Sequence, residues 1–273
     1  MKTLGWIGIG RLGIVQMAIG AIVVLTTSTL NRVMVVELAL PAMLPGALVA
    51  FYYAIQLMRP NWGYRSDSGG SRTPWIIGGM AVLAAGGLAA TLGTVLLETN
   101  RMGGLAVSVL GFALIGVGTG AAGTSLLALL ATATAPERRA AAATITWLMM
   151  IFGIAATAGI VGALLDPYSH ARLVRIVALV AASTVVVSAL AMWGVERGLT
   201  GLPTREDRPA PFLEAFAEIW AEARARRFAI FVFLSMTAYF MQELILEPFA
   251  GHVFGFTPGQ STSMAGLQNG GVF

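Results

Sequence analysis

The sequence contains no cysteine and only two histidines. Without cysteine the chain has no disulfides, thiolate metal sites or cysteine nucleophiles, and two histidines leave little for a histidine-based metal site. It also offers no Ser–His–Asp or Cys–His constellation for covalent chemistry. We therefore predict that the protein holds no metal and is not an enzyme.

Charge is scarce enough to exclude a water-soluble globule. Only 11% of the 273 residues are charged, against about 25% in soluble domains. In contrast, 57% are hydrophobic and the mean hydropathy is +0.79. Because the cations behind the net charge of +4 lie in short segments between apolar runs, we expect membrane lipids and no nucleic acid as partners.

Charge-free stretches near the length of about 20 residues needed to cross a bilayer recur along the chain. Six of them cover residues 12–31, 38–58, 73–97, 102–136, 140–165 and 176–195, with the fourth helix expected over 104–131. A seventh begins at Phe228, an eighth begins near Thr257, and the chain ends at Phe273 within the eighth. The predicted fold class is an all-α polytopic membrane protein. We expect the sequence to be part of a longer protein.

Three regions follow from this pattern: a six-helix bundle over 1–195, a connector over 196–227, and the start of a second bundle over 228–273. Residues 1–11 are expected to form an interfacial lead-in. Within the connector, residues 211–227 place apolar side chains opposite Glu214, Glu218 and Glu222 at helical spacing. This predicts an amphipathic helix on the membrane surface, acting either as a solvated connector or as a partner-docking helix.

The cationic residues set the orientation. With the N-terminus inside, 13 of the 17 fall on the cytoplasmic side: Lys2, Arg11, Arg59, Arg65, Arg72, Arg138, Arg139, Arg197, Arg205, Arg208, Arg224, Arg226 and Arg227. The positive-inside rule therefore predicts a multi-pass protein with a cytoplasmic N-terminus.

The loop between the second and third spans carries Gly63-x-x-x-Asp67-x-x-Gly70-x-Arg72. This resembles the signature loop of the major facilitator superfamily, in the expected position and on the expected side. In this loop Asp67 can pair with Arg72 or meet a helix N-terminus, so we expect a structural role. The resemblance implies the superfamily fold. The drug:proton antiporters of this superfamily usually carry an arginine in the fourth span and a Gly-Pro pair in the fifth, and this sequence has neither. This counts against an ordinary drug exporter.

A narrower resemblance rests on six segments, residues 16–46, 59–63, 72–80, 135–139, 165–167 and 266–271. Together they closely resemble the PucC/LhaA group, the bacteriochlorophyll-delivery branch of the superfamily. The resemblance implies about twelve helices, a place in the intracytoplasmic photosynthetic (inner) membrane of a bacterium, bacteriochlorophyll as a ligand, and light-harvesting antenna and reaction-centre polypeptides as partners. It implies an assembly factor for antenna complexes.

Polar side chains inside apolar runs are the candidate site residues, because they are costly there. Arg32 and Glu37 are expected to flank a helix end, where they pair with each other or serve a ligand or partner site. Glu243 and Glu247 are expected to share one face of the seventh span, at a hydrated mouth or in a central cavity. His252, expected in a loop, is the first candidate ligand for a magnesium tetrapyrrole; His170, Gln16, Asn31 and Gln56 are alternatives.

Three functions remain open from the residues: an assembly factor, an alternating-access transporter of a small amphipathic solute, and a scaffold that holds antenna helices. Spans one to six have almost no mid-membrane charge, which favours the first and third over the transporter. Small residues such as Gly116-x-x-x-Gly120 allow helices to approach closely. Their first expected use is packing inside the bundle, with a smooth lipid-facing surface for antenna helices as the alternative. We expect the outer surface to carry the function, and any glycines within 111–123 that face lipid are the positions that would test this.

Overall fold

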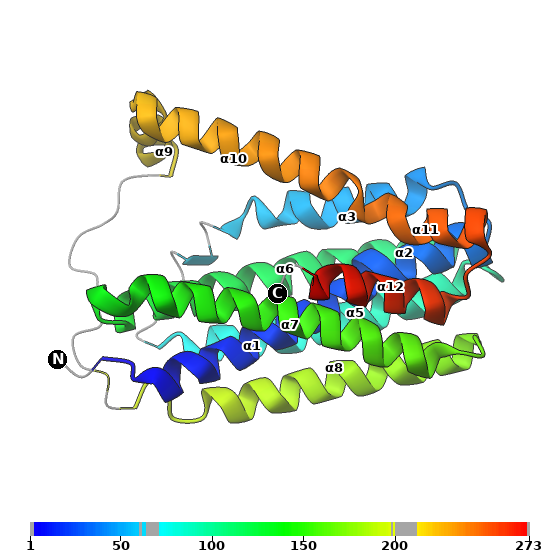
Figure 1. Ribbon diagram of the computed structural model, residues 1–273, viewed down its shortest axis with the longest axis horizontal. Helices are drawn as coiled ribbons and strands as arrows, with labels where there is room; N and C mark the ends of the chain where they lie inside the picture. The colour runs from blue at the N-terminus through cyan, green and yellow to red at the C-terminus, as the bar shows by residue number, and fades with distance from the viewer. Residues whose placement is uncertain (1–2, 60–61, 64–70, 198, 200–211, 272–273) are drawn as a thin grey trace.

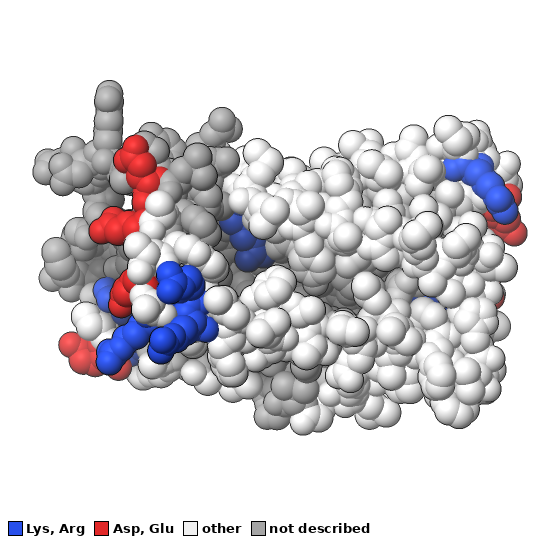
Figure 2. Space-filling model, turned by 90° about the horizontal axis from the view of Figure 1, so that it is seen from above, with Lys and Arg blue, Asp and Glu red and all other residues white. Residues whose placement is uncertain are grey.

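The computed structural model describes residues 3–59, 62–63, 71–197, 199 and 212–271, and the regular structure within them is helical (Figure 1). Five helices are long and apolar enough to cross a membrane: Trp6–Glu37, Thr73–Leu96, Arg101–Ala133, Pro136–Leu165 and His170–Met192. Figure 2 shows that charged side chains on the displayed face gather mainly near the two ends, with a broad uncharged belt between them. The prediction of an all-helical, multi-pass membrane protein is confirmed.

The first span is one continuous helix with two π-helical turns. It comprises α1 (Trp6–Val24), η1 (Leu25–Thr29), α2 (Leu30–Arg32) and η2 (Val33–Glu37). The remaining elements are α3 (Met43–Gln56), α5 (Thr73–Leu96), α6 (Arg101–Ala133), η3 (Pro136–Arg138), α7 (Arg139–Leu165), α8 (His170–Met192), α9 (Phe212–Ala221), α10 (Ala223–Met241), α11 (Glu243–Phe254) and α12 (Pro258–Gly270).

The predicted third, fifth and eighth spans match α5, α7 and α12, but the predicted lead-in over residues 1–11 is wrong, because α1 already begins at Trp6. Arg11 is tolerated inside α1 because its guanidinium donates to main-chain oxygens at the end of α8. The Nε of Arg11 lies 2.7 Å from the oxygen of Ala191, and Nη2 donates to that of Trp193. A cation at a helix C-terminus is also favoured by the helix dipole.

Two other spans have different starts from those predicted. The second was expected from residue 38, but α3 begins at Met43 because Ala39 has a φ of 48° and Pro41 follows it. The sixth was expected from residue 176, but α8 begins at His170. Ser169 caps it by accepting a hydrogen bond from the backbone nitrogen of Arg172 at 3.2 Å, a signal that charge-free length does not detect.

The predicted amphipathic helix over 211–227 is not one helix. It divides at Glu222 into α9, which ends at Ala221, and α10, which begins at Ala223 and continues as the seventh span. That span is itself interrupted at Gln242, between α10 and α11. The side chains of α10 are mostly exposed, with Phe231 64% and Phe233 68% accessible, and α10 and α11 run along one side of the bundle in Figure 1.

Glycines set the closest helix pair, α5 against α6. They recur at seven-residue intervals on both helices, as Gly79, Gly86 and Gly93 on α5 and as Gly104, Gly111 and Gly118 on α6. A Cβ at Gly111 would lie 2.4 Å from the backbone nitrogen of Ala90, and a Cβ at Gly118 would lie 2.4 Å from that of Leu83. All five glycines within 111–123, Gly111, Gly116, Gly118, Gly120 and Gly123, are buried and none faces lipid. The expected use of small residues in internal helix packing is therefore confirmed.

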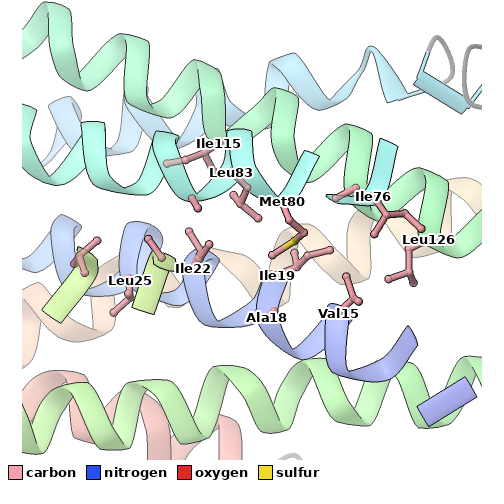
Figure 3. Packing of buried hydrophobic residues seen from close by; sticks show 14 of the residues in the cluster. Val15, Ala18, Ile19, Ile22, Leu25, Ile76, Met80, Leu83, Ile115 and Leu126 are labelled. Atoms are coloured by element: carbon pink, nitrogen blue, oxygen red, sulfur yellow. The ribbon is translucent and has the colours of Figure 1, made fainter. Parts of the chain in front are cut away.

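The first span lies at the centre of the bundle. Val15, Ile19 and Ile22 point from it toward α5 and α6, where they meet Met80 and Leu83 among others (Figure 3). Its other neighbours are α7 and α8. A continuous apolar cluster of this kind needs close packing rather than a hydrophobic drive, because lipid tails are equally apolar.

The helix contacts within the first six spans have an internal symmetry. α1 packs on α7 and α8, α3 on α6, and α5 on both α6 and α8. If α1 is exchanged with α6, α3 with α7 and α5 with α8, the same set of helix contacts is obtained. Such a pattern is what two three-helix repeats related by a two-fold axis would produce.

Candidate functional site: a polar seam between the first span and the last two helices

The π-helical turns of the first span begin where threonine side chains bond to the backbone. Thr26 Oγ1 donates to the carbonyl oxygen of Val23 at 2.8 Å, and Thr27 Oγ1 donates to the same oxygen at 3.0 Å. Side chains that compete for backbone carbonyls in this way bend helices, and π-turns often accompany functional sites. The result is a run of buried polar side chains, residues 26–29, in the middle of an apolar helix.

This run faces α11 and α12 across a surface that we call the polar seam. Its members on the first span are Ser28, Thr29, Asn31, Arg32 and Glu37, and its members beyond the connector are Glu247, Ser261 and Thr262. Residues that lie more than 200 positions apart in the sequence therefore meet there. Most of these polar side chains are buried, each no more than 6% exposed: Ser28, Thr29, Asn31, Arg32, Glu247, Ser261 and Thr262.

Glu247 lies at the centre of the seam and is 1% exposed. Its Oε1 accepts from Ser28, and its Oε2 lies 3.4 Å from Ser261 Oγ and 3.4 Å from Thr262 Oγ1. Thr262 also meets Thr29, with 3.3 Å between the two hydroxyl oxygens. Of the two locations predicted for this glutamate, the structure favours the interior over a hydrated mouth. The side chain of Glu243, predicted to share its face, lies outside the described residues.

Arg32 lies beside this cluster, inside the helix rather than at the helix end where we predicted it. Its Nη1 donates to Glu37 Oε1 at 2.5 Å, and its Nη2 donates to the carbonyl oxygen of Phe256 at 2.5 Å. In an α-helix, residues five apart point about 140° away from each other. The π-turn η2 brings Arg32 and Glu37 to one side of the helix. The predicted pairing of the two residues is confirmed, and the π-turn explains how they can meet.

Three further hydrogen bonds join the later helices to the first six spans. Asn31 Nδ2 donates to the carbonyl oxygen of Leu244 at 2.7 Å. Asp166, which follows α7, accepts from Thr257 Oγ1 at 2.6 Å and from the backbone nitrogen of Gly259 at 3.2 Å. A carboxylate is favoured at a helix N-terminus, so Asp166 fixes where α12 begins.

A groove of about 610 Å³ opens beside the seam, between the end of the first span, the start of α3 and α11. Its walls are mainly apolar, formed by residues such as Val35, Leu40, Ile245, Phe249 and Val253. His252 and Asn31 are its polar side chains. The prediction of His252 in a loop is wrong, because the residue lies in the last turn of α11, where it is exposed to this groove.

The alternative histidine lies elsewhere. His170 begins α8, and its Nδ1 lies 3.3 Å from Glu98 Oε2. The ring of Tyr168 packs edge-on against His170, with 5.6 Å between the ring centroids. Burial raises the pKa of the Tyr168 hydroxyl, and the carboxylates of Glu37 and Glu98 raise it further. His170 is thus the first residue of a helix rather than a loop residue, and it does not line the groove beside His252.

Of the predicted signature loop, the described residues are Gly63 and Arg72, while Asp67 and Gly70 lie outside them. The buried guanidinium of Arg72 donates from Nη1 to Thr132 Oγ1 at 2.6 Å and to the carbonyl oxygen of Ala128 at 3.2 Å. These bonds tie the start of α5 to the end of α6, which supports the structural role that we predicted for Arg72.

Glu196, which the sequence did not single out, joins the same corner. It accepts from the backbone nitrogens of Arg72 at 2.9 Å and Thr73 at 3.1 Å, from Thr73 Oγ1 at 2.8 Å and from Ser71. Burial alone raises the pKa of Glu196, but these hydrogen bonds outweigh it and hold the pKa below the usual value of 4.5.

We expect this carboxylate to make the fold sensitive to acid. Because the folded pKa of Glu196 is lowered, its contribution is present above the unfolded pKa and lost as the pH falls through the folded value. Thermal unfolding followed from about pH 6 to about pH 4 should therefore shift more in the parent than in Glu196→Gln. Glu214→Gln, at an exposed position, is the control; an acid response unchanged by Glu196→Gln would contradict the assignment.

Comparison with known proteins places these elements in a family. The model of the PUCC protein family matches residues 29–273. The chain belongs to this family. It is 63% identical over 271 residues to the "Bacteriochlorophyll synthase 44.5 kDa chain" of Rhodobacter capsulatus, covering 99% of this chain and 63% of that protein.

Two other relatives are more distant. The chain is 33% identical to an "Uncharacterized protein in puhA-bchM intergenic region" of Rhodobacter capsulatus, over 92% of this chain and 55% of that one. It is 28% identical to "Protein PucC" of Cereibacter sphaeroides, over 96% and 60%. The chain thus spans about three fifths of the length of these PUCC relatives. The predicted PucC/LhaA resemblance is confirmed, whereas membership of the major facilitator superfamily stays a prediction.

The matched region contains the whole seam except Ser28. Sequence reasoning found Arg32, Glu37 and Glu247 because charge is conspicuous in an apolar run, but it missed Ser28, Thr29, Ser261 and Thr262. Hydroxyl residues are common in membrane helices, so their spacing alone did not mark them. The one available signal was Thr257-Pro-Gly-Gln260, a capping box that starts α12 and fixes which face carries Ser261 and Thr262.

Proposed function

We propose that this chain is part of an assembly factor for photosynthetic antenna complexes in a bacterial inner membrane. The family match over residues 29–273 is the observation that carries the proposal. A relative that shares 63% of aligned positions is named for bacteriochlorophyll synthesis, which supports a place near that pigment. The role is non-enzymatic: the chain binds antenna or reaction-centre polypeptides and presents bacteriochlorophyll to them.

The groove beside α11 suits such a pigment. A magnesium tetrapyrrole needs one axial nitrogen or oxygen ligand and a broad apolar wall. His252 supplies an imidazole within a mainly apolar lining that includes Leu40, Pro248 and Phe249. Bacteriochlorophyll would supply light absorption when bound, while His252 would hold its metal and the apolar walls would exclude water from the ring.

The absorption spectrum of the protein tests this proposal directly. Purified in mild detergent from pigment-containing membranes, the parent should carry bacteriochlorophyll, and His252→Leu should lower the pigment per protein at least about tenfold, as expected for loss of a metal ligand. His170→Leu is the matched control, since His170 lies outside the groove. Equal pigment content in the two variants would contradict the assignment to His252.

A transporter of a small amphipathic solute remains the second candidate. The buried polar seam favours it, since the scarcity of charge in spans one to six no longer describes the whole interior. The symmetric helix contacts also suit the inverted three-helix repeats of the major facilitator superfamily. Because the chain has no native cysteine, a Thr29→Cys/Thr262→Cys disulfide can lock the seam. A further cysteine, introduced on α6 as Thr124→Cys, can then be labelled with and without the disulfide. A change in its labelling when the seam is locked would favour transport over a static scaffold.

A further inference from the structure

The charges of the polar seam do not balance. Arg32 is 2% exposed and donates hydrogen bonds to Glu37 and to the carbonyl oxygen of Phe256. Glu247 is 1% exposed, and its partners among the described residues are hydroxyl groups rather than a cation. One guanidinium and two carboxylates leave one negative charge. In a membrane interior such a charge is strongly unfavourable unless a positive charge accompanies it.

The nearby helix N-terminus does not supply this positive charge. Ser261 and Thr262 lie in the first turns of α12, whose dipole favours anions. However, the free end of that helix is already occupied by Asp166, which accepts from Thr257 and Gly259. The dipole is therefore offset by another carboxylate, and Glu247 keeps its need for a counter-charge.

Three oxygen–oxygen separations around Glu247 Oε2 match those between ligands of a small ion, whereas Ser28 donates a hydrogen bond directly to Oε1 on the other side of the carboxylate. Three separations, from Glu247 Oε2 to Ser261, from Glu247 Oε2 to Thr262 and from Thr262 to Thr29, are 3.4, 3.4 and 3.3 Å. Hydroxyl hydrogen bonds are usually shorter, with a mode of about 2.7–2.8 Å. In contrast, oxygens bound at about 2.4 Å around a hard cation lie about 3.4 Å apart at adjacent corners of an octahedron.

Hydroxyl protons can also point away from such an ion. Ser261 Oγ donates to the carbonyl oxygen of Pro258 at 3.2 Å, which leaves its lone pairs directed elsewhere. Thr29 lies in the π-helical turn η1, and π-turns often occur at functional sites. The donors are all oxygen, the set preferred by hard cations and not by the histidine-bound or thiolate-bound metals that composition excludes.

We propose that the polar seam binds one sodium ion, held by the Glu247 carboxylate together with the hydroxyl oxygens of Thr29, Ser261 and Thr262, while Ser28 donates a hydrogen bond to the carboxylate. The ion joins the first span to α11 and α12, because its ligands come from both sides of the seam. A single positive charge completes the balance with Arg32 and Glu37, whereas a divalent ion would exceed it. This site does not depend on pigment or antenna binding, so it goes beyond the proposed function.

Binding of radioactive sodium to the purified chain in detergent tests the site. We expect saturable binding of about one ion per protein that unlabelled sodium displaces and choline does not. Glu247→Gln, which keeps the shape and removes the charge, should lower the affinity at least about tenfold. Glu98→Gln is the matched control, since Glu98 is an exposed carboxylate paired with His170 at a loop, and its sodium affinity should equal that of the parent.

Two further measurements keep the result decisive. If Glu247→Gln fails to fold, the sodium site is tested on the parent, which should bind sodium in preference to choline. Ser261→Ala is the second variant, and it should show a smaller loss of sodium affinity. Absence of saturable sodium binding to the folded parent would overturn the proposal, as would equal affinity in folded Glu247→Gln. Protonation of Glu247 without sodium binding would also overturn it. Pigment content and antenna assembly are measured separately, so failure here leaves the proposed function unaffected.

Discussion

Gly79→Leu is expected to reduce the yield of folded protein at least about tenfold, the consequence of overpacking by 1–3 kcal/mol or more. A Cβ at Gly79 would lie 2.6 Å from the backbone nitrogen of Ala122 and 2.9 Å from its Cβ. Backbone atoms cannot move aside as the end of a flexible side chain can. The α5–α6 pair must therefore separate, and the first span packs against both of those helices.

Gly78→Leu is the control for this prediction. Gly78 is the neighbouring residue on the same helix, is exposed, and has no atom within 4 Å of a Cβ built on it. Both variants add the same side chain to α5, so helix propensity and hydrophobicity are matched. Detergent gel filtration and thermal unfolding measure the folded fraction. If Gly78→Leu and Gly79→Leu behave alike, the glycines do not set the distance between α5 and α6.

The sequence predicted the existence of the spans better than their ends. Apolar length alone located α5, α7 and α12, because a helix in lipid must satisfy its own backbone and so follows the apolar run. It failed where local chemistry decides. Ser169 starts α8 early, Ala39 and Pro41 delay α3, and a main-chain site at the end of α8 accommodates Arg11 within α1.

The polar seam was predicted only in part, again because local geometry that apolar length does not reveal decides which residues meet. Arg32 and Glu37 were recognised as a pair, but five residues do not separate partners on one face of an α-helix. Only the π-turn η2 makes the pair geometrically sound, and no simple sequence pattern announces it. The seam also depends on contacts between residues 28–37 and 244–262. Such long-range pairing cannot be read from local periodicity.

Arg32→Met is expected to destabilise the docking of α11 and α12 by about 3 kcal/mol, the cost of breaking a buried charge pair. The substitution removes the donor to the carbonyl oxygen of Phe256 and leaves the negative charge of Glu37 without its guanidinium partner. Methionine retains much of the side-chain volume, so cavity formation contributes little. Thermal unfolding in detergent should show a clearly lower midpoint than in the parent.

The double variant Arg32→Met/Glu37→Leu distinguishes lost charge balance from lost packing. Replacing both members of an ion pair with apolar side chains is often close to neutral, whereas removing one partner is strongly destabilising. Because Glu37 is 31% exposed, water already offsets part of its charge and the recovery should be partial. In a double-mutant cycle the two changes should couple by about 1 kcal/mol or more, since they share one contact. Additive losses would mean that Arg32 stabilises the seam through its hydrogen bond to Phe256, and that its contact with Glu37 contributes nothing.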